Sequence, residues 1–209
     1  MTTGGVARIS AEVAAQVIDS LADHGVAVVD EALPPELVDA LWSRARRQPI
    51  DDFAFGGVGR GNDRLHESLR NDRILWLDPD DAITRSYFDW IESLRNELNR
   101  TLFLGLFEYE CHLAWYPAGS FYQRHRDAFR GGASRRVSTV LYLNRAWASD
   151  DGGALVLYAP SASEPDAQGS RTVAPIYGRL VVFLSEEVPH EVLPAQRSRY
   201  SIAGWFRSA

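Results

Sequence analysis

Apolar residues recur every three or four positions in three stretches of the first half of the chain, as on one buried face of a helix. The first stretch follows Ser10, a favourable N-cap, and stops at His24-Gly25. The second opens at Pro34-Pro35, and the third covers 79–100. Two short apolar runs between the helices are typical of buried strands, at 26–29 and 73–77. The first 107 residues are therefore predicted to be mostly helical.

From about residue 108 the pattern changes to short apolar segments separated by turn-forming residues. These segments predict strands at 109–116, 121–127, 137–143, 154–158, 180–184, 188–193 and 200–206. Many short strands at this spacing favour a sandwich or jelly roll. The sequence thus predicts an α+β fold, with a jelly-roll core over 108–206 and N-terminal helices packed on one face of it. We expect residues 1–209 to form a single domain.

Two polar segments are expected to be loops. Residues 51–72 are rich in Gly, Asp and Arg, and a loop of this length suits a lid that closes on a substrate. A phosphate-binding loop is the alternative, but Gly59-Arg-Gly61 is not followed by the Lys-Ser/Thr pair of a P-loop. The segment 160–173 is expected to be an exposed hairpin loop.

Composition narrows the class of protein. The net charge is −6, which does not favour a nucleic acid or an anionic membrane as the partner. All 22 basic residues are arginine, which excludes chemistry based on a lysine amine. Cys111 is the single cysteine, so no disulfide can form within the chain. No apolar run has transmembrane length and the N-terminus lacks the pattern of a signal peptide, so we expect a cytoplasmic protein. The sequence carries no pattern that sets an oligomeric state.

Three residues in the strand-rich half are candidate metal ligands. His125 and Asp127 are two positions apart, so their side chains would share one face of a strand. His190 could join them from another strand. Two histidines and one carboxylate are the ligands of the facial triad in non-haem Fe(II) oxygenases. A His-x-Asp pair alone arises often by chance, and it is the added His190 and a following arginine that favour a metal site.

That arginine, Arg199, shares a predicted strand face with Ser201, Ala203 and Trp205. A guanidinium beside small residues suits a pocket for an anion, because it can hold a carboxylate through two parallel hydrogen bonds. An ordinary ion pair is the alternative. Tyr142 could donate its hydroxyl to the same carboxylate, or it could be a tyrosine of the core.

Residues 56–206 resemble the 2-oxoglutarate/Fe(II) oxygenases, specifically the prolyl-hydroxylase branch that includes the animal hypoxia-sensing enzymes and bacterial prolyl hydroxylases. The resemblance implies the double-stranded β-helix form of the jelly roll. It rests on segments that occur in the family's order, at Leu69-Arg-Asn-Asp-Arg-Ile-Leu-Trp76, Trp115-Tyr-Pro-Ala-Gly119, Tyr122-Gln-Arg-His-Arg-Asp127, Val140-Leu-Tyr-Leu-Asn144, Pro189-His-Glu-Val192 and Arg199-Tyr-Ser-Ile-Ala-Gly-Trp205.

The resemblance also implies roles for individual residues. The Fe(II) ligands would be His125, Asp127 and His190. Arg199 and Tyr142 would hold the distal carboxylate of 2-oxoglutarate, and Tyr116 would line its pocket. The substrate side would comprise Trp205 near the target prolyl, Arg135 at the entrance, Arg70 and Asp72 organising the loop at 56–70, and His112 in the pocket. Ala203 departs from the animal members, which carry a hydroxyl side chain at this position.

The function implied is a dioxygenase that uses Fe(II), 2-oxoglutarate and O2, with ascorbate as reductant, and produces succinate and CO2. Its substrate would be a proline in a protein or peptide, hydroxylated at C4, and elongation factor Tu is the target that a bacterial member suggests. One alternative is a 2-oxoglutarate oxygenase for another residue or a free small molecule. Another is a non-catalytic jelly-roll module that binds a ligand. A halogenase is disfavoured, because Asp127 supplies the carboxylate that halogenases lose.

Overall fold

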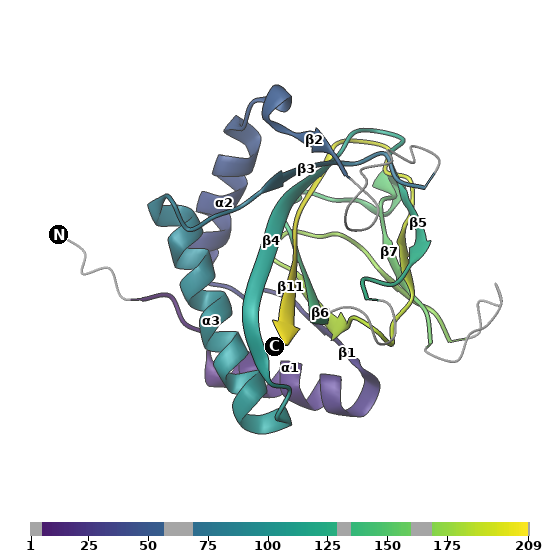
Figure 1. Ribbon diagram of the computed structural model, residues 1–209. Coiled ribbons are helices and arrows are strands. Elements are labelled where there is room, and N and C mark those ends of the chain that lie inside the picture. The colour runs from purple at the N-terminus through teal and green to yellow at the C-terminus, as the bar shows by residue number, and fades with distance from the viewer. Residues whose placement is uncertain (1–5, 57–68, 129–134, 160–168, 209) are drawn as a thin grey trace.

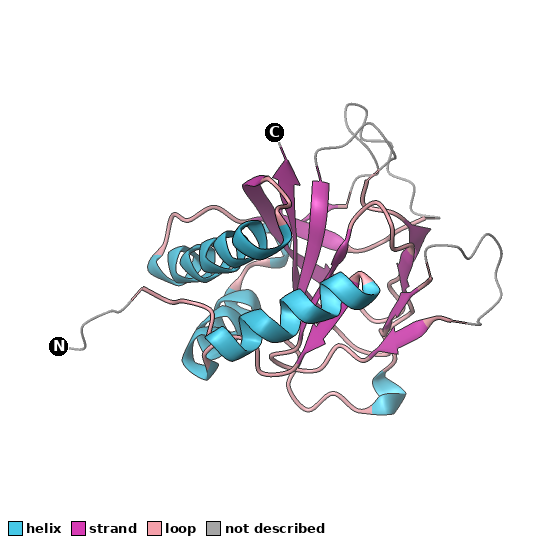
Figure 2. Ribbon diagram, turned by 90° about the horizontal axis from the view of Figure 1, so that it is seen from below, coloured by secondary structure: helices cyan, strands magenta, loops and turns pink. Residues whose placement is uncertain are grey.

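The larger of two antiparallel sheets is covered on its outer face by helices and faces the smaller sheet on its inner side (Figure 1). The computed structural model describes residues 6–56, 69–128, 135–159 and 169–208. Figure 2 shows the helices gathered on one side of the strands. This arrangement confirms the predicted jelly-roll core with helices on one face.

The helices begin and end where local chemistry satisfies their free backbone groups. In the described residues they are α1 (Ala11–His24), α2 (Pro35–Arg47) and α3 (Ala82–Leu102), with short 3₁₀ turns η1 (Ile50–Asp52) and η2 (Ser149–Asp151). Ser10 caps α1 by accepting the Val13 N–H, and Gly25 ends it with φ of 69°. Asp81 forms a capping box with Thr84, which starts α3 at Ala82 rather than at the predicted Pro79.

The larger sheet has the strand order β1-β9-β6-β11-β4-β3-β2 in the part of the chain that the structure describes. Its strands are β1 (Val26–Val29), β2 (Ala54–Phe55), β3 (Arg73–Trp76), β4 (Leu106–Tyr116), β6 (Arg135–Tyr142), β9 (Leu180–Leu184) and β11 (Arg199–Ser208). Strands β1, β2 and β3 come from the half of the chain predicted to be mostly helical. That half therefore extends the sheet as well as covering it.

The smaller sheet has the order β5-β10-β7-β8, again over the described residues. Its strands are β5 (Tyr122–His125), β7 (Leu155–Leu157), β8 (Arg171–Val173) and β10 (His190–Val192). The predicted strands 121–127 and 188–193 are longer than β5 and β10. The prediction of a loop over 160–173 is wrong at its end, because 171–173 pair with β7. A strand of only three residues is too short to show an alternating pattern in the sequence, so β8 could not be predicted. The rest of the predicted loop, 160–168, lies outside the described residues.

The two faces of the larger sheet have different neighbours because side chains alternate along each strand. Leu113, Ile202 and Phe206 point outward and pack with residues of α1, α2 and α3 in the main apolar core. Tyr116 and Tyr142 point inward and pack with residues of the smaller sheet in a second core. Arg199 and Ser201 alternate with Ile202 on β11, so their side chains are also directed between the sheets.

The absence of a side chain at Gly204 leaves room for a row of hydrogen-bonded hydroxyl groups beneath the helices. The Tyr109 hydroxyl lies 3.0 Å from the Tyr87 hydroxyl and 2.9 Å from Thr139 Oγ1, which in turn donates to the Gly204 carbonyl. A Cβ at Gly204 would overlap the Tyr109 ring and come within 2.8 Å of the Cys111 Cβ. Glycine is therefore the residue that lets Tyr109 cross β11 at this point.

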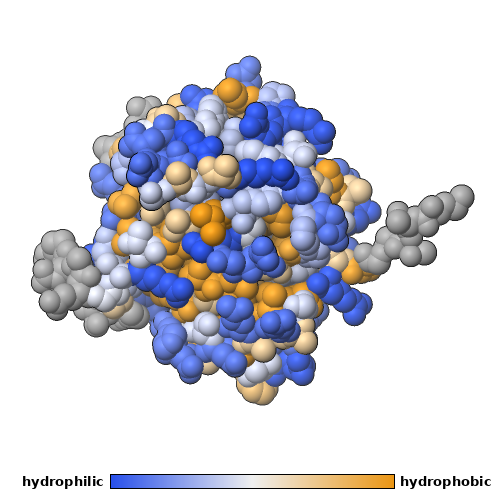
Figure 3. All heavy atoms as spheres, turned by 180° about the vertical axis from the view of Figure 1, so that it is seen from behind, coloured by the Kyte–Doolittle hydropathy of each residue, from blue (hydrophilic) through white to orange (hydrophobic). Residues whose placement is uncertain are grey.

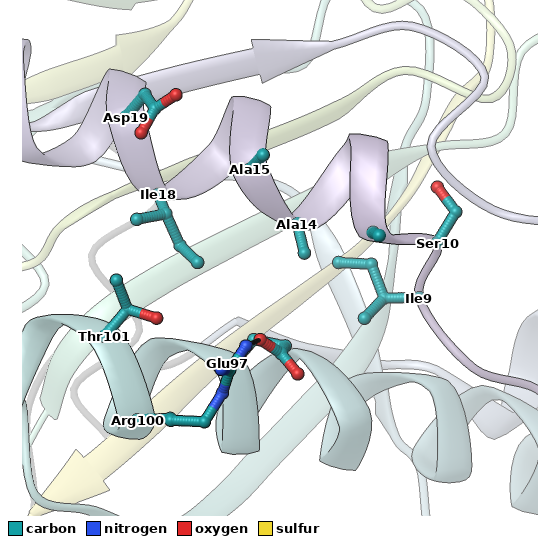
Figure 4. Close-up of a pocket in the computed structure, with 10 residues that line it drawn as sticks. Ile9, Ser10, Ala14, Ala15, Ile18, Asp19, Glu97, Arg100 and Thr101 are labelled. Carbon is teal, nitrogen blue, oxygen red and sulfur yellow. Dashed lines mark hydrogen bonds and ion pairs between the residues drawn. The ribbon is translucent and has the colours of Figure 1, made fainter.

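In the described part of the chain, His125, Asp127 and His190 are the group of at least three potential ligand residues that lie close enough to share a metal. Hydrophilic side chains dominate the rear face, with apolar areas between them (Figure 3). A shallow hollow between α1 and α3 is lined by apolar and polar residues that face each other across the two helices (Figure 4), among them Ile9, Ala14, Ile18, Glu97, Arg100 and Thr101. None of the candidate metal ligands lines it. In the described part of the chain, no helix combines the length and the apolar character needed to cross a bilayer.

The close packing at Gly204 generates a test. Gly204→Ala should lower the free energy of unfolding by about 2 kcal/mol or more, because overpacking a filled core forces its neighbours to move. Urea unfolding measures the change. In the double variant with Tyr109→Ala the glycine substitution should cost less, because the overlap with the ring is gone and only the contact with the Cys111 Cβ remains. Equal costs in both backgrounds would contradict the steric account.

Candidate metal centre and co-substrate pocket

Two strands of the smaller sheet bring the candidate metal ligands together. His125 ends β5 and His190 begins β10, and the two are paired in register. The Asp127 carboxylate lies between the imidazoles, with Oδ1 3.5 Å from His125 Nε2 and Oδ2 3.6 Å from His190 Nε2. One ligand atom from each residue lies within 4.8 Å of the others. This is a compact set of two nitrogens and one oxygen donor, which suits a divalent metal such as Fe(II).

Asp127 reaches this position in a different way from the one predicted. Strand β5 ends at His125, so Asp127 lies beyond it and does not share a strand face with His125. The chain bends after His125 and still directs the carboxylate to the two rings. The prediction that the two side chains share one strand face was therefore wrong. The two side chains are nevertheless close together, as predicted.

Both histidines are oriented by backbone carbonyl groups. The Nδ1 atom of His125 lies 2.9 Å from the Gln123 carbonyl oxygen, and the Nδ1 atom of His190 lies 3.1 Å from that of Val188. An Nδ1–H bonded to a carbonyl leaves Nε2 deprotonated and available to a metal. Burial lowers the pKa of His190 to about 4, so this ring is neutral at neutral pH. Nε2 is therefore the nitrogen of each ring that faces Asp127.

Asp127 is held by a chain of buried hydroxyls. Ser138, on β6, donates to Asp127 Oδ2 at 2.7 Å, and its Oγ lies 2.8 Å from that of Ser185. Because Ser138 gives its one proton to the carboxylate, Ser185 donates to Ser138. Burial alone would raise the pKa of Asp127, but the adjacent His190 and His125 outweigh it and hold that pKa well below its usual range. The carboxylate is therefore ionised and fixed in orientation.

The Arg199 pocket lies on the inner face of the larger sheet. Arg199 is 1% exposed, and its guanidinium lies 4.7 Å from the centre of the Tyr116 ring and 5.0 Å from that of Tyr142. Arg199 Nε donates to the Gly153 carbonyl at 3.0 Å and Nη1 to Ser201 Oγ at 3.3 Å. No carboxylate of the described residues pairs with it, and the buried Tyr142 hydroxyl has no partner among them either. Both groups are available to an anion.

The aromatic wall, Trp76, His112 and Trp205, is next to the metal residues. The His112 ring lies 5.1 Å from that of Trp76 and 5.2 Å from that of Trp205. The Arg135 guanidinium lies 3.7 Å above Trp205 and is paired with Glu110 at 2.7 Å. Burial lowers the pKa of His112 to about 3, so it is neutral. The structure brings His112, Arg135 and Trp205 together, as the resemblance implies, and their roles towards a substrate stay predictions.

Arg70 and Asp72 form a buried ion pair beside β5. Arg70 Nε and Nη2 donate to the two carboxylate oxygens of Asp72 at 2.7 and 2.6 Å. The predicted role of the pair was to organise the loop at 56–70, but residues 57–68 of that loop lie outside the described residues. The structure instead places the pair against Tyr122, which adjoins the metal ligand His125.

Sequence reasoning gave no role to Ser138, Ser185, Trp76, Tyr122 or Glu110. Ser138 had one available signal, since it alternates with Val140 and Tyr142 on the inner face of β6. The roles of the other four residues depend on contacts between strands that are distant in the sequence, and spacing along the chain does not reveal such contacts.

The site and fold define a class of protein. The sequence profile of the 2OG-Fe(II) oxygenase superfamily matches residues 111–207, which contain all three metal-site residues and Arg199. A Pseudomonas putida prolyl-4-hydroxylase structure is 43% identical, covers 94% of this chain and 99% of its own, and has a TM-score of 0.82. The chain belongs to the 2OG-Fe(II) oxygenase superfamily.

Animal relatives are similar over nearly the whole chain. A Trichoplax adhaerens prolyl hydroxylase, solved in complex with a hypoxia inducible factor peptide fragment, is 26% identical, covers 94% of this chain and 90% of its own, and has a TM-score of 0.82. Human Egl nine homolog 1 is 26% identical over 92% of this chain and 46% of its own length. The chain thus spans about half the length of the human Egl nine relative.

The hydroxyl chain behind Asp127 yields a prediction on metal affinity. Ser138→Ala should weaken Ni(II) binding by about tenfold or more, because the carboxylate loses the bond that orients it. Isothermal titration of metal-free protein measures the dissociation constant. Thr139→Val is the matched control, since it removes a buried hydroxyl from the opposite face of β6. A loss of the same size in the control would mean that β6 packing, and not the bond to Asp127, sets the affinity.

The buried neutral histidines yield a prediction on pH. The folded metal-free protein keeps His112 and His190 unprotonated below pH 6.5, where the unfolded chain binds protons. Its free energy of unfolding should therefore fall from pH 6.5 towards pH 4, by up to about 1.4 kcal/mol per pH unit for each histidine. Urea unfolding at several pH values measures the slope. His112→Phe should remove about half of it, whereas His24→Gln, at an exposed position, should leave it intact.

Proposed function

We propose that this protein is an Fe(II)- and 2-oxoglutarate-dependent dioxygenase that hydroxylates a prolyl residue, at C4, in a protein or peptide. Family membership supports the cofactor and the co-substrate. The similarity to a bacterial prolyl-4-hydroxylase over almost the full length of both chains supports the type of substrate. The similarity to an animal prolyl hydroxylase that was solved with a peptide supports a substrate within a polypeptide.

The observation that carries the proposal is the buried charge of Arg199. Burying a guanidinium without a counter-charge is costly, and among the described residues no carboxylate offsets it. The unpartnered Tyr142 hydroxyl lies beside it, and burial raises the pKa of Tyr142, which keeps its proton available for donation. One carboxylate would satisfy both groups. The distal carboxylate of 2-oxoglutarate is therefore assigned to Arg199 and Tyr142, with Tyr116 lining the pocket.

The donor set suits the metal. His125, Asp127 and His190 would hold Fe(II) through two neutral imidazoles and one carboxylate, and a facial set of three protein ligands leaves positions for co-substrate and O2. Bound Fe(II) would supply O2 activation coupled to the decarboxylation of 2-oxoglutarate to succinate and CO2. Ascorbate is the proposed reductant that keeps the metal ferrous.

Other groups of the protein position the metal ligands and the substrate. Ser138 and Ser185 keep Asp127 aligned, and the carbonyl groups of Gln123 and Val188 orient both imidazole rings with Nε2 towards the metal position. The aromatic wall offers flat apolar surface suited to an uncharged pyrrolidine ring. Arg135, neutralised by Glu110, offers further N–H donors at the edge of that wall for a peptide backbone.

Two alternatives make different predictions. An oxygenase for another residue or a small molecule would form succinate without modifying proline. A non-catalytic binding module would form no succinate, although it could still hold an acidic ligand at Arg199. The cytoplasm remains the proposed compartment, supported by the single cysteine.

The direct test combines the purified protein with Fe(II), 2-oxoglutarate, ascorbate, O2 and prolyl peptides, including proline-containing peptides of elongation factor Tu. Succinate release together with a product heavier by one oxygen atom on proline supports the proposal. Mass spectrometry locates the modified residue and amino-acid analysis distinguishes the 4-hydroxy isomer. Succinate without proline modification would favour the other oxygenase, and no succinate with every substrate would favour the binding module.

A substitution of Arg199 should affect co-substrate binding and leave metal binding almost unchanged. Arg199→Gln should weaken 2-oxoglutarate binding by about 10- to 100-fold, the size expected for losing a charge-assisted hydrogen-bond pair. Its Ni(II) affinity should change by less than about threefold, because Arg199 contacts no metal-site residue. Titrations with each ligand measure both constants. Arg197→Gln is the control, since Arg197 pairs with Asp151 at the surface. Equal loss of both ligands in Arg199→Gln would make Arg199 a structural residue.

A further inference from the structure

The two histidines of the metal centre are held in different ways. His190 has a side chain that is 7% exposed and packs edge-on against Phe183, with ring centres 4.7 Å apart. Phe183 is fully buried in the core between the sheets. The side chain of His125 is 19% exposed, and among the described residues its ring contacts are with His190, at 4.3 Å, and with Tyr122, which is only partly buried. The ring of His125 is thus held at a more exposed position than that of His190.

Tyr122 is the residue that faces the His125 ring. The two rings are stacked, with centres 3.6 Å apart and planes inclined by 14°. A parallel stack restrains rotation of an imidazole about its side-chain bonds, while the bond from Nδ1 to the Gln123 carbonyl restrains it at one edge. Tyr122 can do this only if its own ring is held.

Arg70 holds that ring. Its guanidinium carbon lies 4.3 Å from the centre of the Tyr122 ring, within the range of a cation–π contact. The guanidinium is in turn fixed by the two parallel bonds to Asp72, whose side chain is fully buried. Gly56 packs directly on Arg70, since a Cβ there would lie within 2.5 Å of Arg70 Nε. The guanidinium is thus confined between an ion pair, a glycine backbone and an aromatic ring.

The backbone reinforces the same contact. Arg70 and Tyr122 form an antiparallel bridge, and the Gln123 N–H donates to the Leu69 carbonyl at 2.8 Å. The Phe121 N–H donates to the Asn71 side chain at 2.8 Å. The segment 69–71 therefore lies directly beside β5, the strand that ends in His125, and is held to it by backbone hydrogen bonds.

We propose that Arg70, fixed by Asp72, is a positioning residue for the metal ligand His125 and acts on it through the Tyr122 ring. The proposal rests on the metal site of the proposed function, but not on 2-oxoglutarate or on the identity of the substrate. Asp72 has a second task in this arrangement. It offsets a positive charge that would otherwise repel a metal dication nearby.

The test is metal binding alone. Metal-free protein is titrated with Co(II), whose visible absorption reports ligand geometry as well as affinity. Arg70→Lys keeps the charge but loses the planar fork, and Tyr122→Leu removes the ring. Each should weaken Co(II) binding by about tenfold and change the absorption spectrum, the size expected when a group that orients a ligand is lost. The double variant should be little worse than either single one, because both act along one path.

Arg73 supplies the matched control. It lies 4.4 Å from the Phe55 ring centre and 6.0 Å from that of Trp115, so it makes similar contacts three residues away without adjoining a metal ligand. Arg73→Lys should bind Co(II) within about twofold of the unmodified protein. Thermal unfolding of each metal-free variant shows that it is folded, and if Arg70→Lys does not fold, Tyr122→Leu decides.

Three results would overturn the proposal. Arg70→Lys and Tyr122→Leu could both retain full affinity and an unchanged spectrum. Arg70→Gln could alter affinity while Arg70→Lys does not, which would show an effect of charge and not of position. The two losses could also add fully in the double variant. None of these results depends on turnover, so failure to form succinate would refute the proposed function and leave this proposal standing.

Discussion

A buried positive charge with no counter-charge among the described residues is the constraint around which the interior of this protein is arranged. Arg199 lies between the two sheets, where a lone guanidinium is costly. The Gly153 carbonyl, the Ser201 hydroxyl and two tyrosine rings satisfy part of it. Among the described residues they leave the guanidinium without a counter-ion, which fits the acidic co-substrate of the proposed function. Such a pocket is formed before its ligand arrives, which reduces the ordering needed on binding.

The metal residues depend on the same two-sheet arrangement. One face of the larger sheet is apolar and is covered by helices, so the other face is free to carry polar groups against the smaller sheet. The smaller sheet pairs His125 with His190, and the larger sheet supplies Ser138 beneath Asp127. Each of the three candidate ligands is held by a different contact. The buried Phe183 ring packs against His190, the hydroxyls of Ser138 and Ser185 hold Asp127, and the Tyr122 ring stacks on His125.

The fold class could be predicted from the sequence because it depends on local periodicity. Ser10 and Gly25 bound α1, and the strand 180–184 is found as predicted. Strand β8 was missed and β5 was overextended, because pairing with a distant strand decides the ends of such short segments. The strands predicted at 26–29 and 73–77 are found as β1 and β3, whereas β2 was not predicted, and all three belong to the larger sheet.

The sequence by itself determined the candidate ligand set, because two histidines and one aspartate are typical of an Fe(II) site and a following arginine suits an acidic co-substrate. It also determined which residues share a strand face with Arg199, because alternation along a strand is a local property, whereas the direction of that face between the sheets came from the structure. Only the tertiary structure decided what holds these groups. The contacts of Ser138 with Ser185, of Arg70 with Tyr122 and of Arg135 with Glu110 join residues whose proximity depends on strand pairing. Neither residue type nor spacing along the chain specifies such pairing, because it is fixed by the packing of the whole core.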